Sequence, residues 1–144
     1  PQILPNAELE DILSDVMIRA GLGQQQAPRV AIEMIASYGM PVGKDVFETC
    51  VWVGRFVAAC SPYMPRRVYR QQVKSELCKS TRATDANIRQ AIIDRYAPTG
   101  GGKTPQIGTK SKPGPLYGVT SHCWAALGVG ITAQAHWDEL ETFE

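Results

Sequence analysis

The sequence predicts an α/β fold, because hydrophobic patterns of helical spacing alternate along the chain with short β-branched runs. The first strand-like run lies in RVAIEMIASYGM, between Arg29 and Met40, and the second lies between Arg66 and Gln71. The predicted order is helix, strand, helix, strand, helix, helix, with one more helix near the end of the chain. Two strands are too few for a stable sheet. We therefore expect further strands upstream of Pro1 or from a partner chain.

The first half of the chain contains two predicted helices with a strand between them. Asn6 is expected to cap a helix through AELEDILSDVMIRA, which stops at Gly21. The strand around Glu33 follows. A second helix is predicted over roughly Lys44 to Ala59, before Pro62 and Pro65. Its core candidates are Val46, Phe47, Val51, Val53 and Phe56.

The second half is predicted to be largely helical after the strand that starts at Arg66. QQVKSELCKS reads as a short helix, and Thr84 is expected to cap the helix DANIRQAIIDRY. Residues 98–117 are rich in Gly, Pro and Lys, which predicts a mobile basic loop. The last helix is predicted from roughly Ser121 to Gln134, where small residues favour close packing against a sheet.

The length and composition of the chain are those of an ordinary globular protein. The 144 residues are 44% hydrophobic and 20% charged, which predicts a single domain over residues 1–144. Four widely spaced cysteines without a C-x-x-C pair predict reduced thiols in a cytoplasmic protein and argue against a zinc site. Apolar runs are far shorter than the roughly 20 residues of a membrane span, so no membrane partner is expected.

Charge is distributed unevenly along the chain. Residues 66–112 carry eleven basic and three acidic side chains, a net charge of +8, whereas both flanking segments are acidic. Clustered Lys and Arg supply the salt-dependent part of nucleic-acid affinity. The basic segment is therefore either a phosphate-binding face or an ordinary solvated surface. The DNA-binding candidates are Arg66, Arg67, Arg70, Lys74, Lys79, Arg82 and Arg89.

Glu33 is the most informative residue, because it interrupts an apolar run of the kind a buried strand needs. A buried carboxylate costs several kcal/mol unless a cation pairs with it. Glu33 therefore indicates a metal, a cation or a solvent-filled cleft, or else an acid at a strand edge that faces solvent. His122, at the start of the last predicted helix, is a candidate metal ligand or a simple capping residue. The GGGK run at Gly100 to Lys103 lacks the rest of a phosphate loop and is interpreted as flexible.

The order of several segments resembles the RuvC-like Holliday junction resolvases, especially those of bacteriophages. The resemblance runs from about Arg29 to Thr132, and no single motif carries it. The matching segments are AIEMI, WVGRF, VYRQQVKSELC, ATDANIRQAIIDRY and SHCWAALGVGITA.

The resemblance implies an RNase H-like mixed sheet flanked by helices, with its first strands missing from this chain. It implies a metal-dependent endodeoxyribonuclease that resolves branched DNA by Mg²⁺-dependent phosphodiester hydrolysis, with Mn²⁺ as a substitute, usually as a homodimer. Glu33 matches the family's strand acid, and His122 matches a late ligand that is acidic or histidine. Both would be catalytic metal ligands, and Lys74 would approach a DNA phosphate. If the protein is phage-encoded, its location is the cytoplasm of a bacterial host.

Two departures leave alternatives open. The family's first catalytic Asp lies on a strand that would be upstream of Pro1, and Ala125 stands where many members have a second late acid. The rival hypothesis is a non-catalytic DNA-binding or assembly protein on the same fold. A third is an interaction module whose basic segment docks an acidic protein.

Overall fold

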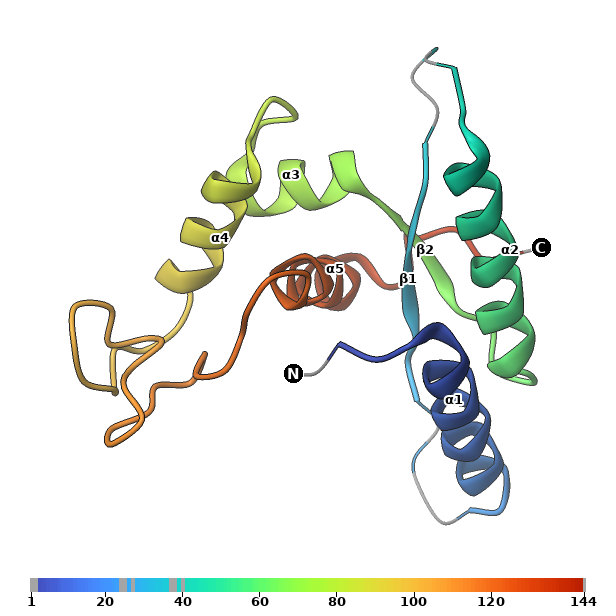
Figure 1. The fold of residues 1–144 in the computed structure, drawn as a ribbon, viewed down its shortest axis with the longest axis horizontal. Helices are drawn as coiled ribbons and strands as arrows, with labels where there is room; N and C mark the ends of the chain where they lie inside the picture. Colours follow the sequence, from blue (N-terminus) through green and yellow to red (C-terminus); the bar gives the residue numbers. More distant parts are fainter. Residues whose placement is uncertain (1–2, 24–25, 27, 37–38, 40, 144) are drawn as a thin grey trace. The chain divides into compact units, whose positions relative to one another are not determined.

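The computed structural model describes residues 3–23, 26, 28–36, 39 and 41–143, and the chain divides into two compact units. The helical unit consists of Gln71–Thr132 together with Pro1–Ile3. The sheet unit consists of Leu4–Arg70 together with Ala133–Glu144. Figure 1 shows the elements of both units. A single domain over the whole chain stays a prediction.

Two helices pack side by side in the sheet unit. They are α1 (Asn6–Gly21) and α2 (Lys44–Ala59), which lie together in Figure 1. Arg55 of α2 ties the helices together, because its guanidinium donates hydrogen bonds to both carboxylate oxygens of Glu10 in α1, one of them over 3.1 Å. The hydrogen bond to Glu10 raises the pKa of Arg55. The same guanidinium lies 4.3 Å from the ring centroid of Trp52.

The sheet of this unit is a parallel pair of short strands. They are β1 (Ala31–Met34) and β2 (Arg66–Tyr69), in a register that places Glu33 opposite Val68. Parallel strands require a crossover connection, and α2 supplies it. On its other edge β2 pairs with the C-terminal segment, since Arg66 forms an antiparallel bridge with Thr142. The predicted α/β class is thus confirmed, whereas further strands upstream stay a prediction.

Three helices form the helical unit together with the long loop of residues 98–117. They are α3 (Arg70–Cys78), α4 (Asp85–Asp94) and α5 (Cys123–His136), the first and last of which each extend into the sheet unit. The predicted cap of α4 is confirmed. The Thr84 hydroxyl accepts a hydrogen bond from the Asn87 amide (3.3 Å), and the Asn87 side chain accepts one from the Thr84 amide (2.9 Å). No described helix is long and apolar enough to cross a membrane.

Two details of the predicted helices are wrong. Asn6 is the first residue of α1 and not its cap; Pro5 is the cap residue and offers no side-chain hydrogen bond. The core of α2 is also smaller than predicted. Phe47 and Val51 are 62% and 64% exposed, and Val53 is the buried residue of this helix. Apolar spacing identified the helix, but it did not identify which face is covered.

Gly128 of α5 packs against the other helices of the helical unit, whereas packing of the small residues of α5 against a sheet stays a prediction. An added Cβ at Gly128 would lie 3.1 Å from a methyl group of Val73 in α3, and 3.7 Å from a methyl group of Ile88 in α4. Gly130, two residues further along the same helix, has no such neighbour within 4 Å. Glycine at position 128 therefore lets α5 approach α3 and α4 closely.

The four cysteines are free thiols, in agreement with the sequence prediction. Cys50 is exposed and Cys78 half-buried, whereas Cys60 and Cys123 are buried. Burial raises the pKa of Cys60, because the thiolate loses its hydration. Cys60 is therefore a structural residue of the sheet unit and a poor nucleophile at neutral pH.

The packing of α5 gives a direct stability prediction. We expect Gly128→Leu to lower the free energy of unfolding by about 1–3 kcal/mol, because the new side chain overpacks the contact with Val73 and Ile88. The matched control is Gly130→Leu, at an exposed position of the same helix, which should stabilise by up to about 1 kcal/mol through helix propensity. Urea unfolding followed by circular dichroism measures both. Equal effects of the two changes would contradict the packing argument.

Candidate functional site

Glu33 lies on the half-buried strand β1, and its own side chain is exposed. Its neighbours Ile32 and Met34 are half-buried, and Val68, its register partner in β2, is fully buried. Successive side chains of a strand point to opposite faces, so Glu33 faces away from the side on which Ile32 and Met34 lie. Of the alternatives left open by the sequence, the exposure of Glu33 agrees with an acid that faces solvent and not with a buried carboxylate. Glu33 is an accessible acid on a short strand.

A cation lies next to this acid. Arg70 follows directly after β2 as the first residue of α3, and its guanidinium nitrogen lies 3.6 Å from a carboxylate oxygen of Glu33. The register explains the approach, because Tyr69 is paired with Met34, so the chain leaves β2 beside the end of β1. The side chains of Arg70 and Glu33 are 27% and 38% exposed, and an ion pair so open to water is worth at most about 1 kcal/mol. A stronger ligand can therefore separate the pair.

The pair lines an open pocket of about 340 Å³ in the sheet unit. Besides Glu33 and Arg70 it is lined by the end of the strand region and by Thr49 of α2. The remaining lining residues are Met34, Ile35 and Ala36. The pocket thus combines one carboxylate, one guanidinium and one hydroxyl above an apolar floor. Such a mixed lining suits a ligand that carries both charged oxygens and an apolar part.

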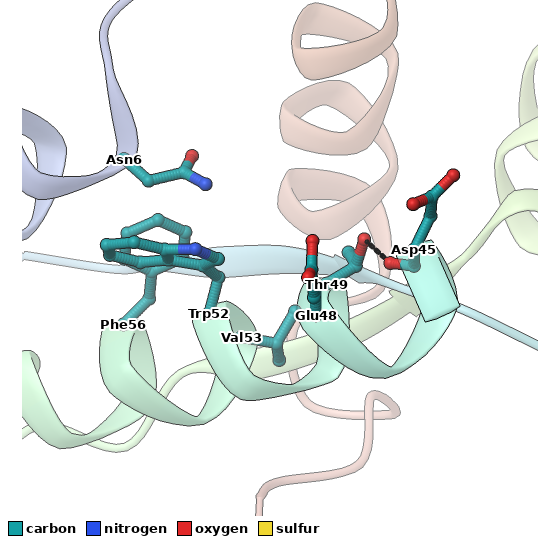
Figure 2. Close-up of a pocket in the computed structure, with 7 residues that line it drawn as sticks. All are labelled: Asn6, Asp45, Glu48, Thr49, Trp52, Val53 and Phe56. Atoms are coloured by element: carbon teal, nitrogen blue, oxygen red, sulfur yellow. Dashed lines mark hydrogen bonds between the residues drawn. The ribbon is translucent and has the colours of Figure 1, made fainter. Parts of the chain in front are cut away.

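Thr49 also lines a second pocket, of about 350 Å³, between α2 and the start of α1. Figure 2 shows the Thr49 hydroxyl bonded to the carbonyl oxygen of Asp45, a distance of 2.7 Å. The same figure shows Trp52 and Phe56 together beside Asn6; their ring centroids are 5.8 Å apart. Sequence reasoning missed this pocket, because its lining comes from two helices far apart in the chain.

His122 lies in the helical unit, immediately before α5, and is exposed. Its carbonyl oxygen accepts the amide hydrogen of Ala126 over 3.1 Å, so its backbone belongs to the first turn of that helix. Ser121, just before it, has a φ of 45°. Glu33 belongs to the sheet unit, and the pairing of the two side chains as metal ligands stays a prediction.

The donor atoms in the described part of the chain do not make a metal centre. No group of three or more His, Cys, Asp or Glu side chains that could hold an ion occurs among those residues. The carboxylate of Glu33 has a guanidinium as its charged neighbour in the sheet unit, and one carboxylate does not satisfy the ligands of Mg²⁺. These residues alone therefore do not fit the expected ion.

Two of the basic residues predicted to bind DNA hold the C-terminal segment against β2. Arg66 donates a hydrogen bond to the carbonyl oxygen of Leu140 over 3.0 Å, and its guanidinium lies 5.6 Å from the ring centroid of Trp137. The Arg67 guanidinium lies 4.9 Å from the ring centroid of Phe143. Both side chains are half-buried. Their structural role is visible in these contacts, and a phosphate contact stays a prediction.

Arg70 belongs to the sheet unit, and the remaining four predicted cations lie in the helical unit. Arg82 and Arg89 are exposed, and the Arg89 guanidinium lies 5.0 Å from the ring centroid of Trp124. Lys74 is half-buried on α3. Lys79 is exposed and forms an ion pair with Glu76 over 3.2 Å. The structure thus divides the predicted DNA-binding set between the two units.

The role of Arg66 can be tested against that of Arg82. We expect Arg66→Gln to lower the free energy of unfolding by about 1–2 kcal/mol, because it loses the Leu140 hydrogen bond and the Trp137 contact. Arg82→Gln, at an exposed position, should change stability by no more than about 0.5 kcal/mol. Urea unfolding measures both variants. If Arg66→Gln is as stable as the wild type, the C-terminal segment does not depend on this residue.

Comparison with known proteins gives a fold and no closer assignment. No protein-family model matches the sequence, and the search of curated proteins gives no match either. Among solved structures, the chain is similar to "Thermus thermophilus RuvC structure", with a TM-score of 0.56 and 15% sequence identity. The match covers 97% of this chain and 75% of the solved chain. At this identity the likeness concerns the fold alone: the protein has a mixed α/β fold similar to that of RuvC.

Proposed function

We propose that the protein is a structure-specific endonuclease that acts on branched DNA such as Holliday junctions. The supporting observation is the combination of a RuvC-like fold over 97% of the chain with an accessible acid, Glu33, at an open pocket beside the end of a parallel strand. In open sheets of this kind, ligands bind beside the carboxyl ends of the strands. The bacteriophage type and the RNase H-like topology of the full sheet are part of the proposal.

The proposed roles follow the resemblance of the sequence segments. Glu33 and His122 would be ligands of Mg²⁺ or Mn²⁺, which stabilises charge on the scissile phosphate when it is bound. Further acids would be needed, because the described residues do not complete such a site. Within the pocket, Arg70 would attract a phosphate toward Glu33 and offset the repulsion between the two anions, which its 3.6 Å contact with Glu33 supports. A homodimer would present two such pockets to one junction.

A second candidate function is a DNA-binding or assembly protein that does not cleave. The observation that favours it is the Glu33 and Arg70 pair, in which the carboxylate is already neutralised by a side chain of the same unit. Ala125 on α5, where related enzymes are expected to carry an acid, favours it as well. Binding without cleavage would need the basic residues and not Glu33.

A nicking assay distinguishes the two functions. Purified protein is incubated with four-way, forked and linear DNA of the same sequence, with Mg²⁺ or with a chelator. Nicks in branched DNA that require Mg²⁺ support the endonuclease. Salt-dependent binding to branched DNA without nicking favours the non-catalytic function. Failure to bind any DNA supports the interaction module for acidic proteins.

The catalytic role proposed for Glu33 can be tested by substitution. We expect Glu33→Gln to abolish nicking while the Kd for junction DNA stays within about fivefold, because an exposed ion pair contributes at most about 1 kcal/mol. The matched control is Glu48→Gln, an exposed acid of α2 that pairs with Lys44, and it should keep both activities. Gel shift and nicking assays on one four-way junction measure them. Equal loss of binding and nicking in Glu33→Gln would count against a catalytic role.

A further inference from the structure

We propose that residues 98–117, here named the lysine loop, form a preshaped surface that binds DNA phosphates and one unpaired base. This inference rests on the proposed function, because it adds a contact for the same branched DNA. It differs from the sequence prediction in one respect. The loop was expected to be mobile, and the proposal gives it a fixed shape that is ready for its ligand.

Backbone hydrogen bonds within the loop support a fixed shape. The Gly101 amide donates to the carbonyl oxygen of Lys112 over 2.9 Å, and the Thr109 amide donates to the same oxygen over 3.0 Å. Further along, the Leu116 amide donates to the carbonyl oxygen of Gln106 over 2.8 Å. These hydrogen bonds join positions up to eleven residues apart. The loop therefore folds back on itself, and its first half is hydrogen-bonded to its second half.

Glycines make this closure sterically feasible. A Cβ at Gly108 would lie 2.2 Å from the backbone nitrogen of Gly114, and Gly108 also has a φ of +80°. A Cβ at Gly114 would lie 2.3 Å from the carbonyl oxygen of Pro105. Both clashes involve backbone atoms, which cannot move aside without opening the loop. The Gly-rich composition that predicted flexibility therefore serves close backbone approach.

The loop presents positive charge that no nearby acid in the sequence offsets. Lys103, Lys110 and Lys112 are all exposed, and no Asp or Glu occurs between Asp94 and Asp138. Two cations elsewhere in the helical unit differ in this respect. Lys79 and Arg95 both pair with Glu76, over 3.2 Å and 2.8 Å. The lysine loop thus carries three exposed cations without an acid nearby in the sequence, and phosphate is the ligand chemistry that such a loop suits.

An exposed aromatic side chain lies at the end of the loop. Tyr117 is 45% exposed, although its backbone is fixed by a hydrogen bond from its amide to the carbonyl oxygen of Gly114 over 3.1 Å. The preceding Leu116 is buried and anchors the segment. Exposed aromatic rings next to lysines can stack on unpaired bases, which branched DNA offers and a regular duplex does not. A preshaped loop also loses less conformational entropy when it binds.

The phosphate contact is tested with Lys110→Gln/Lys112→Gln. We expect the slope of log K against log salt to fall by about 2, as for two lost phosphate contacts on duplex DNA, with at least about tenfold weaker binding at low salt. The control is Lys44→Gln, an exposed lysine of α2, which should leave the slope unchanged. Fluorescence anisotropy with labelled forked and linear DNA gives both slopes. An unchanged slope in the double variant overturns the proposal.

The fixed shape has its own test, which changes no charge. Gly108→Ala should weaken DNA binding as much as the double lysine variant, because it forces the loop open. The matched control is Gly118→Ala, since Gly118 has a nearly identical φ of +81° but no atom within 4 Å of an added Cβ. Circular dichroism checks that both variants remain folded. Equal affinities of Gly108→Ala and the wild type would overturn the preshaped surface.

The base contact is tested with Tyr117→Ala. The variant should bind forked DNA about tenfold more weakly while its affinity for linear duplex stays unchanged. Equal effects on both DNAs overturn the stacking contact. If the double lysine variant binds DNA normally but loses binding to poly-glutamate, the ligand is an acidic protein, and the proposal is wrong. Absence of nicking in the wild type removes only the proposed enzymatic function, whereas absence of all DNA binding overturns both.

Discussion

The parallel pairing of β1 with β2 is the constraint on which the candidate site depends. Because parallel strands run in the same direction, both end at the same edge of the sheet, and the chain leaves β2 at Arg70 beside the end of β1. That geometry brings the guanidinium of Arg70 within 3.6 Å of Glu33. It also requires a crossover, which α2 provides, and α2 contributes Thr49 to the same pocket. A shift of the register by one residue would turn Glu33 toward the half-buried side of the strand and remove the pocket's acid.

Two strands alone would be a weak platform for such a site, and the C-terminal segment strengthens it. Arg66 bridges to Thr142 through the backbone, and its side chain reaches the carbonyl oxygen of Leu140. The guanidinium groups of both Arg66 and Arg29 lie over the ring of Trp137, and that of Arg29 lies 5.2 Å from the ring centroid. Cationic side chains therefore fix residues that follow α5 to a strand more than seventy positions earlier. These guanidinium groups lie against aromatic rings, which distinguishes them from the lysines of residues 98–117.

Features that depend on residues close in the sequence could be predicted, whereas features that depend on contacts between distant segments could not. The cap at Thr84 could be predicted because a Thr directly before a helical pattern is a local signal, and its partner Asn87 lies only three residues away. The bounds of α2 follow from its own spacing and the prolines after it. Burial depends on what covers a side chain, so the core assignment of Phe47 failed, whereas the exposure of Glu33 agrees with one of the alternatives that its pattern left open. The proximity of Arg70 to Glu33 depends on strand register, which no local pattern in this chain specifies. Glycines in residues 98–117 were interpreted as a source of mobility, since close approach between distant backbone segments leaves no mark in a single sequence.

The pocket at Glu33 and the lysine loop differ in how strongly each is expected to attract a phosphate of the same DNA. At Glu33 a phosphate meets a carboxylate whose charge Arg70 offsets, so the net attraction there is small and binding depends on what else enters the pocket. At the lysine loop we expect a stronger attraction, because its three exposed lysines have no acid nearby in the sequence. Affinity and chemistry are then expected to come from different parts of the chain, since groups that bind phosphate strongly in the ground state do not by themselves accelerate its hydrolysis. An acid in a weak ion pair with an arginine is the better place for a reacting phosphate, and a basic loop of fixed shape is the better place to hold the rest of the DNA.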